Sequence, residues 1–147
     1  AFTAVAARLV RRGRGDPVRV AALAGYALSC VFLFAMSGVY HLLPPGVGRA
    51  VLARLDHAAI FVLIAGTFTP VHGIAFRGAA RWVPLAVLWA VAAAAVSLKT
   101  VFFDRLPEGV GLAAYLAMGW AGVATGGALW RRHGWPFVRP LAWGGVA

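Results

Sequence analysis

Residues 21–43 read AALAGYALSCVFLFAMSGVYHLL and contain no Lys, Arg, Asp or Glu. An α-helix rises about 1.5 Å per residue, so this run is long enough to cross about 30 Å of hydrocarbon. Comparable apolar runs follow along the chain, and short segments rich in Gly, Pro or Arg separate them. The sequence therefore predicts an all-α fold, a polytopic transmembrane helix bundle.

The composition agrees with a membrane protein and excludes a soluble globular domain. Of the residues, 62% are hydrophobic and 12% are charged, and the mean hydropathy is +0.82. The net charge of +10 would suggest nucleic-acid binding, but the arginines fall between apolar runs rather than on one face. Arginines in loops orient helices and meet anionic head groups. We therefore expect membrane lipids as partners and no nucleic acid.

The domain organisation follows from the apolar runs. We expect one transmembrane domain over residues 1–147, with complete spans at about 20–43, 57–76, 82–103 and 110–130, and a further span starting in 140–147. The first Met lies inside a span, and the last residues lie part-way into an apolar run, so the chain is interpreted as a fragment. Residues 44–55 are expected to form a loop.

Several residues inside the spans carry predictions of their own. Pro70 removes a backbone donor, so it should kink or interrupt its helix, and the hydroxyls of Thr67 and Thr69 could satisfy carbonyls there. Lys99, near the end of a span, is expected to extend its amine toward the head groups. Gly122 and Gly126 would give one helix a face of small residues that allows close helix packing.

A small group of polar residues lies where the first two complete spans meet. Ser37 and His41 are one helical turn apart on one face, and Asp56 opens the next span. Consecutive spans joined by a short loop are antiparallel, so the three residues should lie at one end of the bundle and at similar depth. Such groups are costly beside hydrocarbon unless they are paired or used. Alternatively, Ser37 bonds to a carbonyl of its own helix, and Asp56 caps its helix or pairs with an arginine.

Four motifs together give the sequence a family resemblance. They are residues 37–41 (SGVYH), 54–61 (RLDHAAIF), 64–70 (IAGTFTP) and 115–120 (YLAMGW). With these motifs, the chain closely resembles the bacterial haemolysin III family, within the wider group of progestin and adiponectin receptor-like proteins. The resemblance extends from about residue 19 to residue 130. It implies a seven-helix, multi-pass protein, here in a bacterial inner membrane.

The resemblance also implies a zinc site. In the family, three histidines hold the metal: His41 matches the first, and a His-x3-His motif in the last helix supplies the others. Asp56 matches the residue thought to hold or activate a zinc-bound water, and Ser37 matches a residue that assists polarisation or orientation. The implied activity is zinc-dependent hydrolysis of a lipid amide or acyl bond. A membrane-perturbing protein and a lipid-sensing receptor with a structural zinc are the alternatives.

This sequence departs from the family pattern at the metal site. It contains no His-x3-His motif, and His57, His72 and His133 are its other histidines. We expect these three to lie in loops or at the membrane interface, and the zinc site to be incomplete within this chain. The excess of arginine in segments 1–19, 72–81 and 131–139 predicts that His41 faces away from the cytoplasm. The receptor-like relatives imply the opposite side, so the orientation stays open.

Overall fold

The structure, a computed structural model, describes residues 2–102 and 108–146 and the side chains of residues 4–102 and 109–143. The described residues form six helices and no strand. The helices are α1 (Phe2–Arg11), α2 (Pro17–Leu42), α3 (Val47–Ala75), α4 (Ala79–Val101), α5 (Glu108–His133) and α6 (Trp135–Val146). By length and composition, α2, α3, α4 and α5 can each cross a membrane. The predicted all-α polytopic bundle is confirmed.

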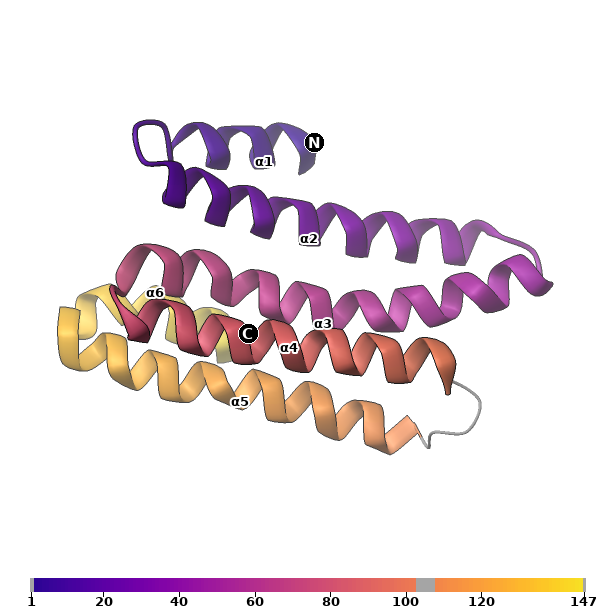
Figure 1. Cartoon of the computed structure of the whole chain (residues 1–147). Coiled ribbons are helices and arrows are strands. Elements are labelled where there is room, and N and C mark those ends of the chain that lie inside the picture. Colours follow the sequence, from indigo (N-terminus) through magenta and orange to yellow (C-terminus); the bar gives the residue numbers. More distant parts are fainter. Residues whose placement is uncertain (1, 103–107, 147) are drawn as a thin grey trace.

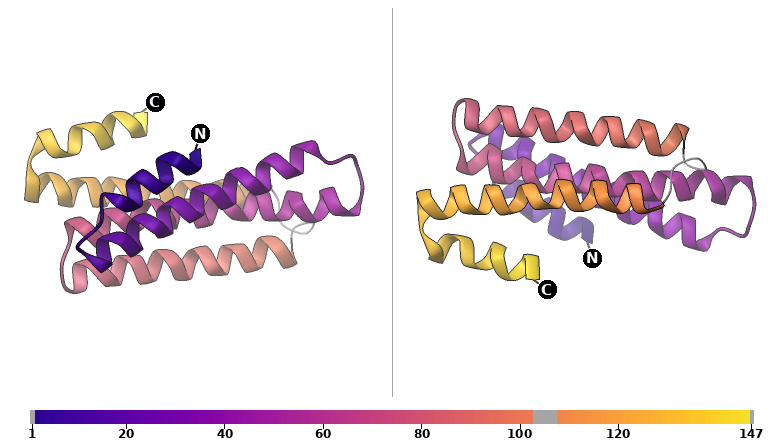
Figure 2. Two further views of the ribbon diagram at one scale, coloured as in Figure 1. Left: turned by 90° about the horizontal axis from the view of Figure 1, so that it is seen from above. Right: turned by 90° about the horizontal axis from the view of Figure 1, so that it is seen from below.

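Helix α3 lies at the centre of the bundle and contacts α2, α4 and α5 (Figure 1). Helix α1 packs on α2, and α6 folds back along α5. The turns α1–α2, α3–α4 and α5–α6 gather at one end of the molecule, and the α2–α3 turn lies at the other (Figure 2). The main core joins α3, α4 and α5 through apolar side chains that are almost fully buried, including Phe61, Ala65, Leu88, Ala92 and Met118.

Small residues hold α2 and α3 close together. A Cβ added at Gly66 of α3 would collide with the side chain of Ser29 of α2, and one added at Gly73 would lie 3.1 Å from the Cβ of Ala22. Moving seven residues along either helix leads from the first pair to the second, so both pairs define one antiparallel register. Close packing of this kind is typical of membrane helices, since apolar surface alone gives little drive to associate in lipid.

Helix α3 begins earlier than the sequence predicted. The segment 44–55 was expected to be a loop, but α3 starts at Val47, directly after a turn that includes Pro44, Pro45 and Gly46. The 29 residues of α3 span roughly 44 Å, more than the roughly 30 Å of hydrocarbon. The first turns of α3 can therefore lie beyond the hydrocarbon, where Arg49 and Arg54 are tolerated within a helix.

Two other boundaries differ from expectation. Helix α3 runs through Pro70 without interruption, and Thr67 and Thr69 donate hydrogen bonds to the carbonyls of Ile64 and Ala65, at 2.7 and 2.9 Å. The next span was expected to start within residues 140–147, but α6 starts earlier, at Trp135. Only Gly134 separates α5 from α6, and its φ of 79° allows the sharp reversal.

Candidate functional site

The register of α2 and α3 places the three predicted site residues at one level. Ser29 of α2 packs against Gly66 of α3. Ten residues further along α2 is Val39, and ten residues back along the antiparallel α3 is Asp56, so these two residues lie opposite each other. Ser37 and His41 lie two residues to either side of Val39, which is about 3 Å along the helix axis. The backbone therefore brings Ser37, His41 and Asp56 to a similar depth, although no hydrogen bond joins their side chains in the described part of the chain.

Ser37 differs from the other Ser and Thr residues whose side chains the structure describes. Each of the others hydrogen-bonds through its hydroxyl: Ser29, Thr67, Thr69, Ser97 and Thr100 to carbonyls of their own helices, and Thr125 to His72. Ser37 is half-buried, and within the described residues its hydroxyl makes no hydrogen bond. The alternative in which Ser37 bonds to its own helix does not hold in this structure, and its hydroxyl is available for a ligand.

Asp56 lies well inside α3 and is half-buried. Gly46 occupies the position before the first turn of α3, so Asp56 does not cap this helix. Among the residues that the structure describes, its carboxylate has no hydrogen bond and no ion pair. Neither of the alternatives considered for Asp56 from the sequence, capping or pairing with an arginine, is present, and its carboxylate remains available.

Tyr115 of α5 contacts the segment of α3 that carries Asp56, and it was not predicted as a site residue. The Tyr115 hydroxyl donates a hydrogen bond of 3.1 Å to the backbone carbonyl of His57, the residue that follows Asp56. The Tyr115 ring packs on Phe61 with 4.5 Å between the ring centroids. Tyr115 thus connects α5 to the segment of α3 that carries Asp56. The motif 115–120 carried the family resemblance, but nothing in its spacing indicated this contact.

His41 is exposed in the last turn of α2. Its ring stands edge-on to Tyr40 at 4.8 Å, and the guanidinium of Arg49 lies 5.2 Å from the Tyr40 ring. The Nδ1 atom of His57, which follows Asp56 in α3, lies 2.8 Å from the Ala53 carbonyl, so the His57 ring is held along its own helix. Of these two imidazoles, His41 is the one with free access.

The described side chains do not make a zinc site by themselves. Zinc sites in proteins take three or four Cys, His, Asp or Glu ligands. Within residues 2–102 and 108–146, no group of three such side chains comes together. The donors at this level of the bundle therefore do not fit a complete zinc centre, and further ligands would be needed to hold a metal with His41.

His72 was expected to lie in a loop or at the membrane interface, and the structure excludes the loop because His72 lies in the last turn of α3. Its side chain is buried, with Nδ1 3.1 Å from the carbonyl of Ala80 and Nε2 3.1 Å from the hydroxyl of Thr125. The ring also stacks on Phe76 at 4.7 Å. Both ring nitrogens are used within the bundle, because the first turn of α4 and helix α5 enclose the end of α3. His72 is therefore a structural residue.

Lys99 was expected to reach toward the head groups, but it is only 7% exposed. Its side chain folds over Gly111 of α5, where an added Cβ would lie 2.7 Å from Cε and 2.8 Å from Nζ. The absence of a side chain at Gly111 provides the space for this burial. A count of charges along the sequence does not reveal such a space, since it depends on how α4 and α5 pack.

We predict that Tyr115→Phe destabilises the protein modestly. The substitution leaves the ring on Phe61 but removes the hydrogen bond to the His57 carbonyl, which in membrane helices contributes about 0.6 to 2 kcal/mol. Thermal unfolding in detergent checks the expected decrease in melting temperature. Tyr40→Phe is the matched control, because the Tyr40 hydroxyl has no hydrogen bond among the described residues. Equal melting of both variants would contradict this role of Tyr115.

Comparison with known proteins agrees with the bundle and its motifs. A family model described as haemolysin-III related matches residues 1–146. Hemolysin-3 of Bacillus cereus is 34% identical over 106 residues, which are 72% of this chain and 48% of that protein. A Hemolysin-3 homolog of Bacillus subtilis (strain 168) is 30% identical over 95 residues, covering 65% and 44% of the two chains.

The chain spans about half the length of the curated relatives it matches. No solved structure matches it significantly. The family match nevertheless extends over nearly every residue, and the four apolar helices are those of an integral membrane protein. The chain therefore belongs to the haemolysin III family of multi-pass membrane proteins.

Proposed function

We propose that the complete protein is a zinc-dependent hydrolase of a lipid amide or a similar acyl bond, with Ser37, His41 and Asp56 at its reaction site. The observation that carries this proposal is that two polar groups close to each other in depth lack hydrogen-bonding partners among the described residues. The Ser37 hydroxyl and the Asp56 carboxylate lie half-buried at one level, and neither has a hydrogen-bonding partner among the described residues. Polar groups in such a position within membrane helices are typical of functional sites.

Each residue has a role suited to its chemistry. His41 would supply one metal ligand through its exposed imidazole, and the other ligands would come from outside residues 1–147. Bound zinc would supply a Lewis acid. The Asp56 carboxylate can accept a proton as a general base, and the Ser37 hydroxyl can donate a hydrogen bond to a polarised carbonyl oxygen. Exposed apolar side chains beside these residues, such as Val39 and Leu42, suit a lipid substrate.

A reconstituted assay tests this function against its alternatives. We expect the complete protein, in vesicles containing a long-chain N-acyl amide lipid, to release the fatty acid. A chelator should stop the release, and added zinc should restore it. Encapsulated dye should stay inside the vesicles. Dye leakage without fatty-acid release would favour a membrane-perturbing protein, and binding of the intact lipid without turnover would favour a receptor-like protein.

A further inference from the structure

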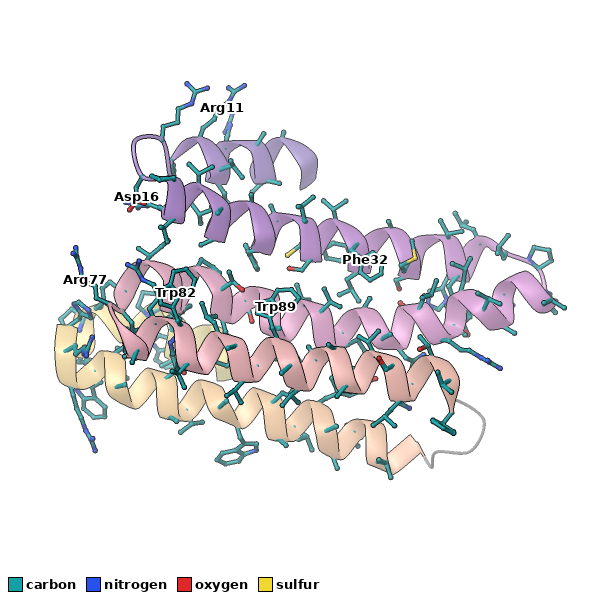
Figure 3. The ribbon with its side chains drawn as sticks, in the orientation of Figure 1. Arg11, Asp16, Phe32, Arg77, Trp82 and Trp89 are labelled. Atoms are coloured by element: carbon teal, nitrogen blue, oxygen red, sulfur yellow. The ribbon has the colours of Figure 1, made fainter. Side chains whose placement is uncertain are left out.

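The end of the bundle opposite Ser37, His41 and Asp56 is strongly basic. The segments 1–19, 72–81 and 131–139 meet there and contain ten arginines but one acid, Asp16. The Asp16 carboxylate already accepts hydrogen bonds from the backbone N–H groups of Val18 and Arg19, at 2.9 and 3.2 Å. Figure 3 shows Arg11, Asp16 and Arg77 at this end. The segments that meet here therefore carry a large excess of positive charge, which favours an anionic ligand from outside them.

A groove between α3, α5 and α6 starts at this basic end. It has a volume of about 560 Å³, and its lining includes Val71, Gly122, Gly126, Leu129 and Leu141. Two hydroxyls also line it, but Thr67 bonds to the carbonyl of Ile64 and Thr125 bonds to His72. From Leu129 to Gly119, the α5 side of the groove is roughly 15 Å long. Its surface therefore suits an acyl chain rather than a polar ligand.

Phe76 connects the groove to the basic end. It packs with Leu129 and Val138, which both line the groove. The guanidinium of Arg132 lies 5.1 Å from the centre of the Phe76 ring, and Nε of Arg81 donates a 2.9 Å hydrogen bond to the Phe76 carbonyl. Guanidinium groups carry five N–H donors, so both arginines keep donors for an anion. The apolar groove thus ends beside arginines that are held in place.

We propose that this groove binds one acyl chain of an anionic phospholipid, with its phosphate on Arg132 and Arg81. Charge complementarity selects an anionic head group, and basic pockets between membrane helices are known to bind such lipids. The site lies at the opposite end of the bundle from Ser37, His41 and Asp56, so it does not depend on the proposed hydrolase activity. An anionic phospholipid of the membrane would thus be a specific ligand of the groove between α3, α5 and α6.

Native mass spectrometry of the complete protein tests the site with two lipids of equal acyl chains, dioleoyl phosphatidylglycerol and dioleoyl phosphatidylcholine. One arginine contributes about 1 kcal/mol, so Arg132→Gln should weaken phosphatidylglycerol binding about fivefold. Phosphatidylcholine binding should weaken by less, because the choline cation already offsets the charge of its phosphate. Arg12→Gln, in the α1–α2 turn, is the matched control and should leave both unchanged. Equal affinity of the wild type for both lipids, or equal losses in both variants, would overturn the proposal.

A second pair of variants tests the groove itself. Gly126 lines the groove and Gly127 does not, and an added Cβ meets nothing within 4 Å at either position. Gly126→Leu should fill the groove and weaken both lipids at least fivefold, whereas Gly127→Leu should change neither. If lipid binding survives Gly126→Leu, the lipid binds elsewhere. If Gly126→Leu alone prevents folding, another segment of the protein occupies the groove, and the proposal is wrong.

Discussion

Asp56→Asn is expected to slow lipid amide hydrolysis by the complete protein about 10²–10⁴-fold, the usual contribution of a positioned general acid or base. Asparagine has nearly the same shape as aspartate but cannot act as a base. Because the Asp56 carboxylate makes no hydrogen bond or ion pair among the described residues, the fold should tolerate this change. Initial rates of fatty-acid release, measured together with the melting temperature, check both expectations.

Ser37→Ala should also slow hydrolysis, and Ser97→Ala is its matched control. The Ser97 hydroxyl donates a 2.9 Å hydrogen bond to the carbonyl of Ala93 of its own helix, whereas the Ser37 hydroxyl makes none among the described residues. Loss of the Ser97 hydroxyl should leave the rate of hydrolysis unchanged.

Wild-type rates for Asp56→Asn would show that this carboxylate takes no part in the reaction. A rate that falls only together with the melting temperature would assign Asp56 a structural role instead.

Gly66→Ala is expected to destabilise the bundle by about 1–3 kcal/mol, the usual effect of overpacking a close contact. The added Cβ would lie 2.7 Å from the Cβ of Ser29, and neither atom can turn away because both are fixed to their backbones. Helices α2 and α3 would have to separate, and α2 contacts the rest of the bundle mainly through α3. The free energy of unfolding in mixed micelles measures the change.

Two further variants separate this contact from a general effect of alanine. Gly38→Ala changes a glycine of α2 that has no atom within 4 Å of an added Cβ, so it should be neutral or slightly stabilising. Adding Ser29→Gly to Gly66→Ala moves the single Cβ to the other helix and should restore part of the lost stability. If Gly66→Ala melts like the wild type, the close packing of α2 on α3 is incorrect.

The fold class could be predicted from the sequence because burial in a membrane requires long charge-free runs. The start of α3 could not be predicted in the same way. Arg49 and Arg54 made residues 44–55 look like a loop, but a helix that extends beyond the hydrocarbon carries arginine without penalty. Pro70 likewise left no break in α3. Local composition therefore located the spans better than it located their ends.

The candidate site was predicted only in part. Helical spacing and the short α2–α3 turn predicted that Ser37, His41 and Asp56 share one level, and the packing register agrees. Contacts between distant helices were missed: the hydroxyl of Tyr115 on His57, the burial of His72 and the burial of Lys99. These contacts depend on which faces of α3, α4 and α5 meet, and the apolar faces of membrane helices do not identify their neighbours.

The metal content of the complete protein tests the proposed function most directly. We expect protein purified without added metal to carry about one zinc ion per chain by inductively coupled plasma mass spectrometry, as a catalytic site would. His41→Ala should lose this zinc. His133→Ala is the control and should keep it, because His133 is exposed at the opposite end of the bundle. A protein without zinc, or a His41→Ala variant that keeps it, would contradict the zinc site.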